Sequence, residues 1–229
     1  MADSNFDQIN HSLDALPPWL TTLSGSVFYS GRAAFSKPAR LYVLGLNPGG
    51  DPIAQSDETI TADIAQFRNQ SERWSAYRDE AWSGSPPGTY GMQPRVLHMF
   101  KTIDLDPATV PASNVMFVRS STEATLGHSK TELLRECWQI HATVIRTLGI
   151  DTIACFGGTA GTHLRSRLGA NQRIDSYSET NLRGWTSEAH GSTDGKVVLT
   201  LSHPSRANWC NPDSDPSDLV KRTLSRPRP

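Results

Sequence analysis

Four short apolar runs alternate along the chain with longer segments whose apolar residues recur at helical spacing. The runs cover residues 41–46, 114–119, 152–156 and 196–201, and each ends in polar residues or glycine. Apolar runs of this length, bounded by turn residues, predict buried strands. Strands that alternate with helices are typical of an α/β sheet. We expect one domain over residues 1–229, because a chain of this length with 37% hydrophobic residues can bury one core.

The segments between these runs predict helices. Helical spacing of apolar residues places them near residues 5–16, 60–67, 96–103, 129–148 and 158–169. Ser129 and Glu132 have the spacing of a capping box at the start of the fourth helix. Residues 53–90 are otherwise polar, which indicates a surface helix or a lid.

Composition excludes several classes of protein. The formal net charge is −1, so any polyanion must bind through a local patch. Candidates for such a patch, which a solvated surface explains equally well, are Arg165, Arg167, Arg173, Lys221, Arg222, Arg226 and Arg228. The three cysteines lie far apart without a C-x-x-C pair, which argues against a zinc ribbon, a disulfide scaffold or an iron–sulfur cluster. Residues 1–17 lack a long apolar run, so we expect no signal peptide, no membrane span and a cytoplasmic location.

Three nucleotide-binding or hydrolase motifs are absent from the sequence. Phe156 occupies the place of the first glycine in a G-x-G-x-x-G pattern over residues 156–161. Residues 191–196 miss the phosphate-loop pattern by one residue and precede a strand. The sequence also lacks the G-x-S-x-G turn of a nucleophilic serine. We therefore expect no cofactor and no nucleoside triphosphatase activity.

The first apolar run ends in Asn47-Pro48-Gly49-Gly50, which places a side-chain amide at the carboxyl end of a buried strand. Ligands of open α/β sheets bind at this edge, so Asn47 is a candidate catalytic residue. In the alternative interpretation, Asn47 only tolerates an unusual backbone angle in a turn.

The fourth run ends in a second polar segment, in which His203 is followed by Pro204 and by hydroxyl, guanidinium and amide side chains. A histidine at a strand end can donate a hydrogen bond to a developing anion while its neighbours bind phosphate. Alternatively, His203 caps an ordinary loop. The other histidines show no metal-ligand spacing.

Together, Gly45-Leu46-Asn47-Pro48-Gly49 and the segment from His203 to Asn208 resemble the two motifs of the uracil-DNA glycosylase superfamily. The chain is most similar to the branch of single-strand-selective monofunctional and mismatch-specific uracil glycosylases, with motifs G-[MI]-N-P-G and H-P-S. The resemblance covers about residues 38–215 and leaves a polar C-terminal tail at about 216–229. It implies a three-layer α/β/α sandwich with a short, mostly parallel central sheet.

The resemblance also implies a monofunctional DNA glycosylase, which flips out an altered base and hydrolyses its N-glycosidic bond to leave an abasic site. Asn47 would orient the attacking water, and His203 would donate a hydrogen bond to the leaving base. The base pocket would include Gly45, Leu46, Pro48, Tyr90 and Ser120. DNA would be contacted by Gly49, Ser205, Arg206 and Asn208. The expected partner is DNA with an altered base, bound by a monomer without a metal ion or iron–sulfur cluster.

One departure from the resembling branch concerns the base. In that branch the second strand ends with an asparagine that reads the base edge, whereas the corresponding place here holds Arg119 or Ser120. Ser120 offers one hydroxyl instead of a paired donor and acceptor. The candidate bases are therefore uracil and a bulky modified pyrimidine in foreign DNA such as phage DNA, which would indicate antiviral defence. The other alternative is an inactive DNA-binding module with this fold.

Overall fold

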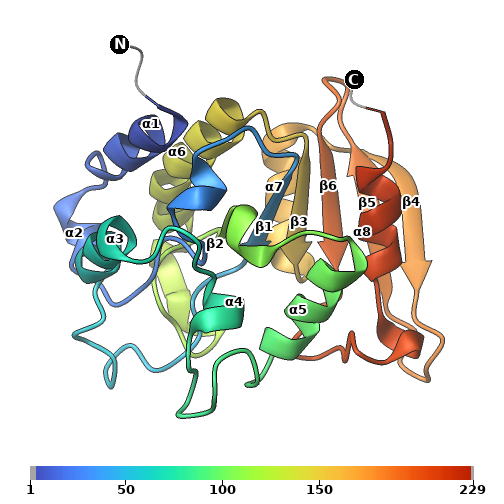
Figure 1. The fold of residues 1–229 in the computed structure, drawn as a ribbon, viewed down its shortest axis with the longest axis horizontal. Helices are drawn as coiled ribbons and strands as arrows, with labels where there is room; N and C mark the ends of the chain where they lie inside the picture. Colours follow the sequence, from blue (N-terminus) through green and yellow to red (C-terminus); the bar gives the residue numbers. More distant parts are fainter. Residues whose placement is uncertain (1–3, 228–229) are drawn as a thin grey trace.

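A central six-stranded sheet with helices on both faces forms the protein (Figure 1). The computed structural model describes residues 4–227, except for the side chains of residues 127 and 128. The strands are β1 (Leu41–Gly45), β2 (Ala112–Asn114), β3 (Thr152–Phe156), β4 (Gln172–Ser178), β5 (Thr186–Gly191) and β6 (Val197–Leu201). The expected three-layer α/β/α architecture is confirmed.

The sheet is mostly parallel, with the strand order β2-β1-β3-β6-β5-β4. β2, β1, β3 and β6 are parallel, whereas β5 is antiparallel to β6 and β4 is antiparallel to β5. The β4–β5 hairpin is an addition to the four predicted strands. Its sequences are polar, and most β4 side chains are exposed or half-buried, because β4 is at the edge of the sheet. No apolar run marks these two strands.

Helices cover the sheet, and those expected near residues 5–16, 60–67, 96–103, 129–148 and 158–169 are present. The longer ones are α1 (Asn5–Leu13), α3 (Ile60–Asn69), α5 (Gln93–Thr102), α6 (Lys130–Leu148), α7 (Gly158–Leu168) and α8 (Ser217–Leu224). The short ones are α2 (Pro18–Thr21), α4 (Ala76–Asp79), η1 (Arg32–Phe35), η2 (Pro107–Thr109), η3 (Glu123–Ser129) and η4 (Pro212–Ser214). Within residues 4–227, no helix has the length and apolar character needed to span a membrane.

Alternate residues of the central strands face two separate cores. In β1, Tyr42 and Leu44 pack with residues of α1, α6 and α7, whereas Leu41 and Val43 pack with residues of α5 and α8. This alternation is the period of a strand whose two faces are both covered. Burial on both faces explains why the sequence of β1 is a continuous apolar run. The strand ends at Gly45, and the loop that carries Asn47 follows it.

The capping box predicted at Ser129 is wrong. Ser129 has helical backbone angles, φ −76° and ψ −9°, and its side chain does not cap the helix. Instead, its hydroxyl donates to the carbonyl oxygen of Leu126. The reason is that η3 runs directly into α6, so the chain is already helical where the cap was expected.

The predicted polar tail is also corrected. Residues 217–224 form α8, in which Leu219 and Val220 are fully buried in the second core. The exposed Asp218 and Lys221 lie between these apolar positions, so the segment is an amphipathic helix rather than a solvated tail. The core therefore extends past residue 215.

Residues 53–90 contain α3 and α4, joined and flanked by loops. Ile60, Ile64 and Phe67 of α3 are buried, as their spacing predicted. The Phe67 ring contacts the rings of Phe28 and Phe35 at centroid distances of 4.9 Å and 5.5 Å. This packing attaches α3 to the core on the α1 side of the sheet.

Candidate active site

Asn47 and His203 lie at equivalent positions beyond two strands of the parallel sheet. Leu44 of β1 is level with Cys155 of β3, and Cys155 is level with Thr200 of β6. Asn47 and His203 each follow their strand residue by three positions. Because adjacent strands are about 4.8 Å apart, the two segments leave the sheet about 10 Å apart, on either side of the end of β3. The two motifs therefore meet at one edge of the sheet.

The Asn47 side chain has a defined orientation. Its Nδ2 donates to the carbonyl oxygens of Pro48, at 2.8 Å, and Ser120, at 3.3 Å. Both amide hydrogens are used in this way, so the remaining polar atom is Oδ1, which is an acceptor. An amide oxygen can orient a water molecule but cannot efficiently take up its proton.

Backbone hydrogen bonds hold the Asn47 loop against the segment that follows β2. The Val115 amide donates to the Gly45 carbonyl at 2.9 Å, and the Ser120 amide donates to the Pro48 carbonyl at 3.0 Å. Pro48 is buried, and the half-buried Leu46 packs against the first core. The loop is therefore rigid on the side of β2, which fixes where the Asn47 amide lies.

Arg119 is a structural clamp on the same loop. Its Nη1 donates to the Gly49 carbonyl at 2.7 Å, and its Nη2 pairs with the Glu58 carboxylate at 2.6 Å. The Arg119 side chain is only 12% exposed, whereas Gly49 is exposed at the surface of the loop. Arg119 is thus occupied by protein atoms, and Gly49 is open to a ligand.

His203 is held as a neutral imidazole with its proton on Nε2. The Ser205 amide donates to Nδ1 at 3.1 Å, and the Ser205 hydroxyl lies 2.8 Å from the same nitrogen. Because Nδ1 accepts a hydrogen bond, the neutral ring carries its proton on Nε2. Burial lowers the pKa of His203, and the nearby Arg206 charge lowers it further. His203 can therefore donate a hydrogen bond from Nε2 without being charged.

Gly157, after β3, makes room for the His203 ring. A Cβ at Gly157 would lie 3.3 Å from His203 Cδ2, and Gly157 has a φ of +96° that favours glycine. The glycine turn that the sequence places after the third strand is therefore a packing surface for the candidate catalytic histidine.

Two arginines that sequence reasoning missed anchor the His203 loop. Arg95 of α5 donates to the Pro204 carbonyl at 2.5 Å, and Arg183 donates to the Arg206 carbonyl at 2.6 Å. Each comes from a distant segment and matches no motif, so the sequence carries no signal for this role. The loop is held from both sides, while Ser205, Arg206 and Asn208, predicted to contact DNA, are exposed.

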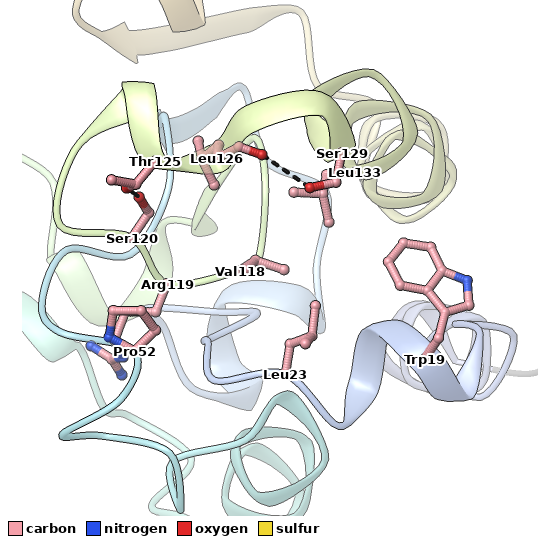
Figure 2. A pocket seen from close by; sticks show the side chains of 10 residues that line it. All are labelled: Trp19, Leu23, Pro52, Val118, Arg119, Ser120, Thr125, Leu126, Ser129 and Leu133. Atoms are coloured by element: carbon pink, nitrogen blue, oxygen red, sulfur yellow. Dashed lines mark hydrogen bonds between the residues drawn. The ribbon is translucent and has the colours of Figure 1, made fainter.

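Ser120 does not present its hydroxyl to the space between Asn47 and His203. Its Oγ donates to the Thr122 carbonyl. The same oxygen lies against the Thr125 hydroxyl (Figure 2). It lines a cavity of about 140 Å³ on the side of Trp19. Ser120 therefore acts on the site through its backbone, which bonds to Pro48 and accepts from Asn47.

The side chain at the end of the second strand is Asn114, not Arg119 or Ser120. The strand expected over residues 114–119 is β2, which ends at Asn114. Asn114 pairs with Gly45 in the sheet, and a Cβ at Gly45 would lie only 2.1 Å from Asn114 Oδ1. Gly45 therefore leaves space for this amide. In the sequence, Asn114 is the polar residue at the start of the apolar run 114–119. In the structure it is the last residue of β2.

Aromatic residues form a wall from Asn114 towards the end of β3. Burial raises the pKa of Tyr29, and the neighbouring Asn114 side chain acts in the opposite direction. Tyr29 stacks on Tyr77 at 5.8 Å between ring centroids, and Tyr77 contacts Phe156 at 6.4 Å. Tyr90, which the resemblance places in the base pocket, is 45% exposed in the loop before α5. Tyr77 is buried, so it supports Tyr29 from within the core and is not itself open to a ligand.

Comparisons with known proteins do not identify a function, so the proposal below rests on the residues of this site. No protein-family model matches the chain, and no curated protein matches it. Among the side chains that the structure describes, no group of three or more His, Cys, Asp or Glu residues is arranged to hold a metal ion.

Proposed function

We propose that the chain is a monofunctional DNA glycosylase that flips out an altered base and hydrolyses its N-glycosidic bond. The observation that carries the proposal is the pair of oriented groups at one sheet edge. Asn47 keeps an acceptor oxygen available for water, and His203 keeps a neutral Nε2–H donor. A nucleotide between them would meet a water on one side and a hydrogen-bond donor on the other.

The chemistry that these two residues support is dissociative. The bond between the base and the sugar C1′ breaks, the base leaves with the electron pair, and water adds to the oxocarbenium-like sugar. The His203 Nε2–H group stabilises the anionic base, and Asn47 Oδ1 orients the water, whose proton passes to solvent. Because Asn47 cannot act as a strong base, stabilisation of the leaving group dominates, and we expect a slow enzyme.

The Asn114 amide is the best-placed group to read the base. An amide offers one donor and one acceptor, which match the edge of a pyrimidine. Rotation of the amide by 180° exchanges its donor and acceptor, so it can pair with the edge of uracil or of a cytosine derivative. Both kinds of base are therefore included in the test. The reason for doubting uracil, a lone Ser120 hydroxyl, no longer applies, because Ser120 bonds to Thr122.

The test is release of the base from defined oligonucleotides. Single-stranded and duplex DNA carrying uracil, mispaired thymine, hydroxymethylcytosine or glucosylated hydroxymethylcytosine is incubated with the protein, and abasic sites are detected by alkaline cleavage. Asn47→Ala and His203→Gln are each expected to lower the excision rate by about 100-fold or more, the usual effect of losing one oriented group. Asn171→Ala and His11→Gln are matched controls, because both residues are exposed and lie in other segments.

The competing function is an inactive DNA-binding module. It predicts that no base is released from any of these oligonucleotides and that Asn47→Ala and His203→Gln change DNA affinity only. Such a result with a folded protein would overturn the glycosylase proposal.

A further inference from the structure

The turn between β4 and β5 lies at the same sheet edge as His203. β5 is antiparallel to β6, with Glu188 paired to Thr200, so the start of β5 is beside the end of β6. Arg183 in this turn donates to the Arg206 carbonyl of the His203 loop at 2.6 Å. The turn and the His203 loop therefore form one continuous surface at the candidate active site.

Leu182 at the tip of this turn is fully exposed, with a relative exposure of 111%. Trp185, at the end of the turn, is 39% exposed, and the Arg183 guanidinium lies over its ring at 4.1 Å from the centroid. Single exposed apolar residues are common on protein surfaces. Leu182 differs in its position, because it stands beside a candidate catalytic loop together with an aromatic ring and two arginines.

The turn is held in a defined conformation, so the exposure of Leu182 does not follow from a loose loop. Asn181 Oδ1 accepts hydrogen bonds from the Arg183 amide, at 2.9 Å, and the Gly184 amide, at 3.3 Å. The Arg183 Nη2 pairs with the buried Glu179 carboxylate at 2.5 Å. The Thr180 amide also donates to the Asp213 carbonyl at 3.0 Å. The tip is therefore a rigid projection.

We propose that this turn inserts Leu182 into the base stack of duplex DNA next to the flipped nucleotide. The inference rests on the proposed function, because a glycosylase acting on duplex DNA must unstack its target. Proteins that kink or open DNA insert apolar side chains between base steps, with arginines binding the adjacent backbone. Here Leu182 is the apolar wedge, and Arg206 is an exposed cation on the adjoining loop.

The experiment measures binding and unstacking without catalysis. The probe is a duplex with a tetrahydrofuran abasic analogue and a neighbouring 2-aminopurine, whose fluorescence rises when it unstacks. Leu182→Ala is expected to weaken binding to this duplex by about 10-fold and to reduce the fluorescence rise, because the wedge is lost. Binding to the single-stranded oligonucleotide should be unchanged, since a single strand requires no opening of a duplex.

Leu105→Ala is the matched control, because Leu105 is also an exposed leucine, at 36%, but lies beyond α5 on a different surface. Leu182→Phe, which keeps a large apolar tip, should retain unstacking. The insertion is overturned if Leu182→Ala binds and unstacks the duplex like the unaltered protein. If a base is excised but Leu182→Ala changes neither binding nor unstacking, the glycosylase proposal holds and the insertion of Leu182 does not. If unstacking depends on Leu182 but no base is excised, the insertion is supported and the glycosylase proposal is rejected.

Discussion

The His203 ring depends on one neighbouring residue for its hydrogen-bonding pattern. The Ser205 amide occupies Nδ1, so protonation of that nitrogen would place two hydrogens against each other. Burial and the Arg206 charge lower the pKa of His203, which keeps the neutral ring populated on acidification. The neutral ring is the form in which His203 can stabilise a leaving anion through Nε2 while Nδ1 still accepts from Ser205.

We therefore predict a single-turnover excision rate that is independent of pH from about pH 8 to about pH 6.5, the ordinary pKa of histidine. A change due to His203 protonation should occur only at lower pH, because its pKa lies below the ordinary value. The measurement is the excision rate on the best oligonucleotide substrate, with His11→Gln as the control. An inflection above pH 6.5 that disappears in His203→Gln would contradict the neutral-histidine assignment.

At the level of elements, β1, β3 and β6 were predictable because both faces of each strand are covered, which leaves an apolar run in the sequence. β4 and β5 were not, because a polar edge hairpin has no such run. The same limit applies to the site. Local motifs point to the candidates Asn47 and His203, whereas the proposed role of Asn114 depends on its pairing with Gly45. Only the three-dimensional register reveals that contact.

His141 in α6 links the stability of the fold to the support of the Asn47 loop. It is fully buried, accepts from the Tyr42 hydroxyl at Nδ1, 2.9 Å away, and donates from Nε2 to the Val115 carbonyl at 3.2 Å. Val115 in turn donates to Gly45. Burial lowers the pKa of His141 to about 4, so the ring is neutral in the folded protein.

We predict that the contribution of His141 to the free energy of unfolding falls as the pH drops from 6.5 towards 4. In this range the unfolded chain binds a proton at His141 and the folded protein does not, so the contribution is present above pH 6.5 and is lost on acidification. Between about pH 6.5 and about pH 5 it amounts to about 2 kcal/mol. The measurement is urea unfolding at several pH values.

The comparison with His141→Gln isolates this effect. The raised pKa of Asp63, about 6 because of burial, acts in the opposite direction over the same range, and it is present in both proteins. The variant should be less stable at neutral pH and should lose less stability on acidification. Equal losses in the two proteins would show that His141 does not carry the pH dependence.

Among the basic residues considered for a DNA-binding patch, Arg228 lies outside the described residues, and most of the others are paired within the protein. Arg165 and Arg173 both lie near Glu188, at 3.8 Å and 3.2 Å, and Arg222 pairs with Asp175 at 3.2 Å. Lys221 lies beside a cavity lined by Arg40 and Leu41, at the amino end of β1 and so at the opposite edge of the sheet. The positive field available at the candidate active site is therefore small and local.

The resulting prediction concerns the salt dependence of DNA binding. If Arg206 and the neighbouring turn supply about two phosphate contacts, the logarithm of the association constant should fall with the logarithm of salt with a slope of about −2. Affinity would then drop only about 15-fold between ~50 mM and ~200 mM salt, because few counterions are released. Fluorescence anisotropy with the duplex that carries the abasic analogue gives this slope, and Arg206→Gln should make it shallower by about one. Arg173→Gln is the control, since its charge is paired with Glu188. A slope steeper than about −5 would mean that a broader basic surface binds the DNA.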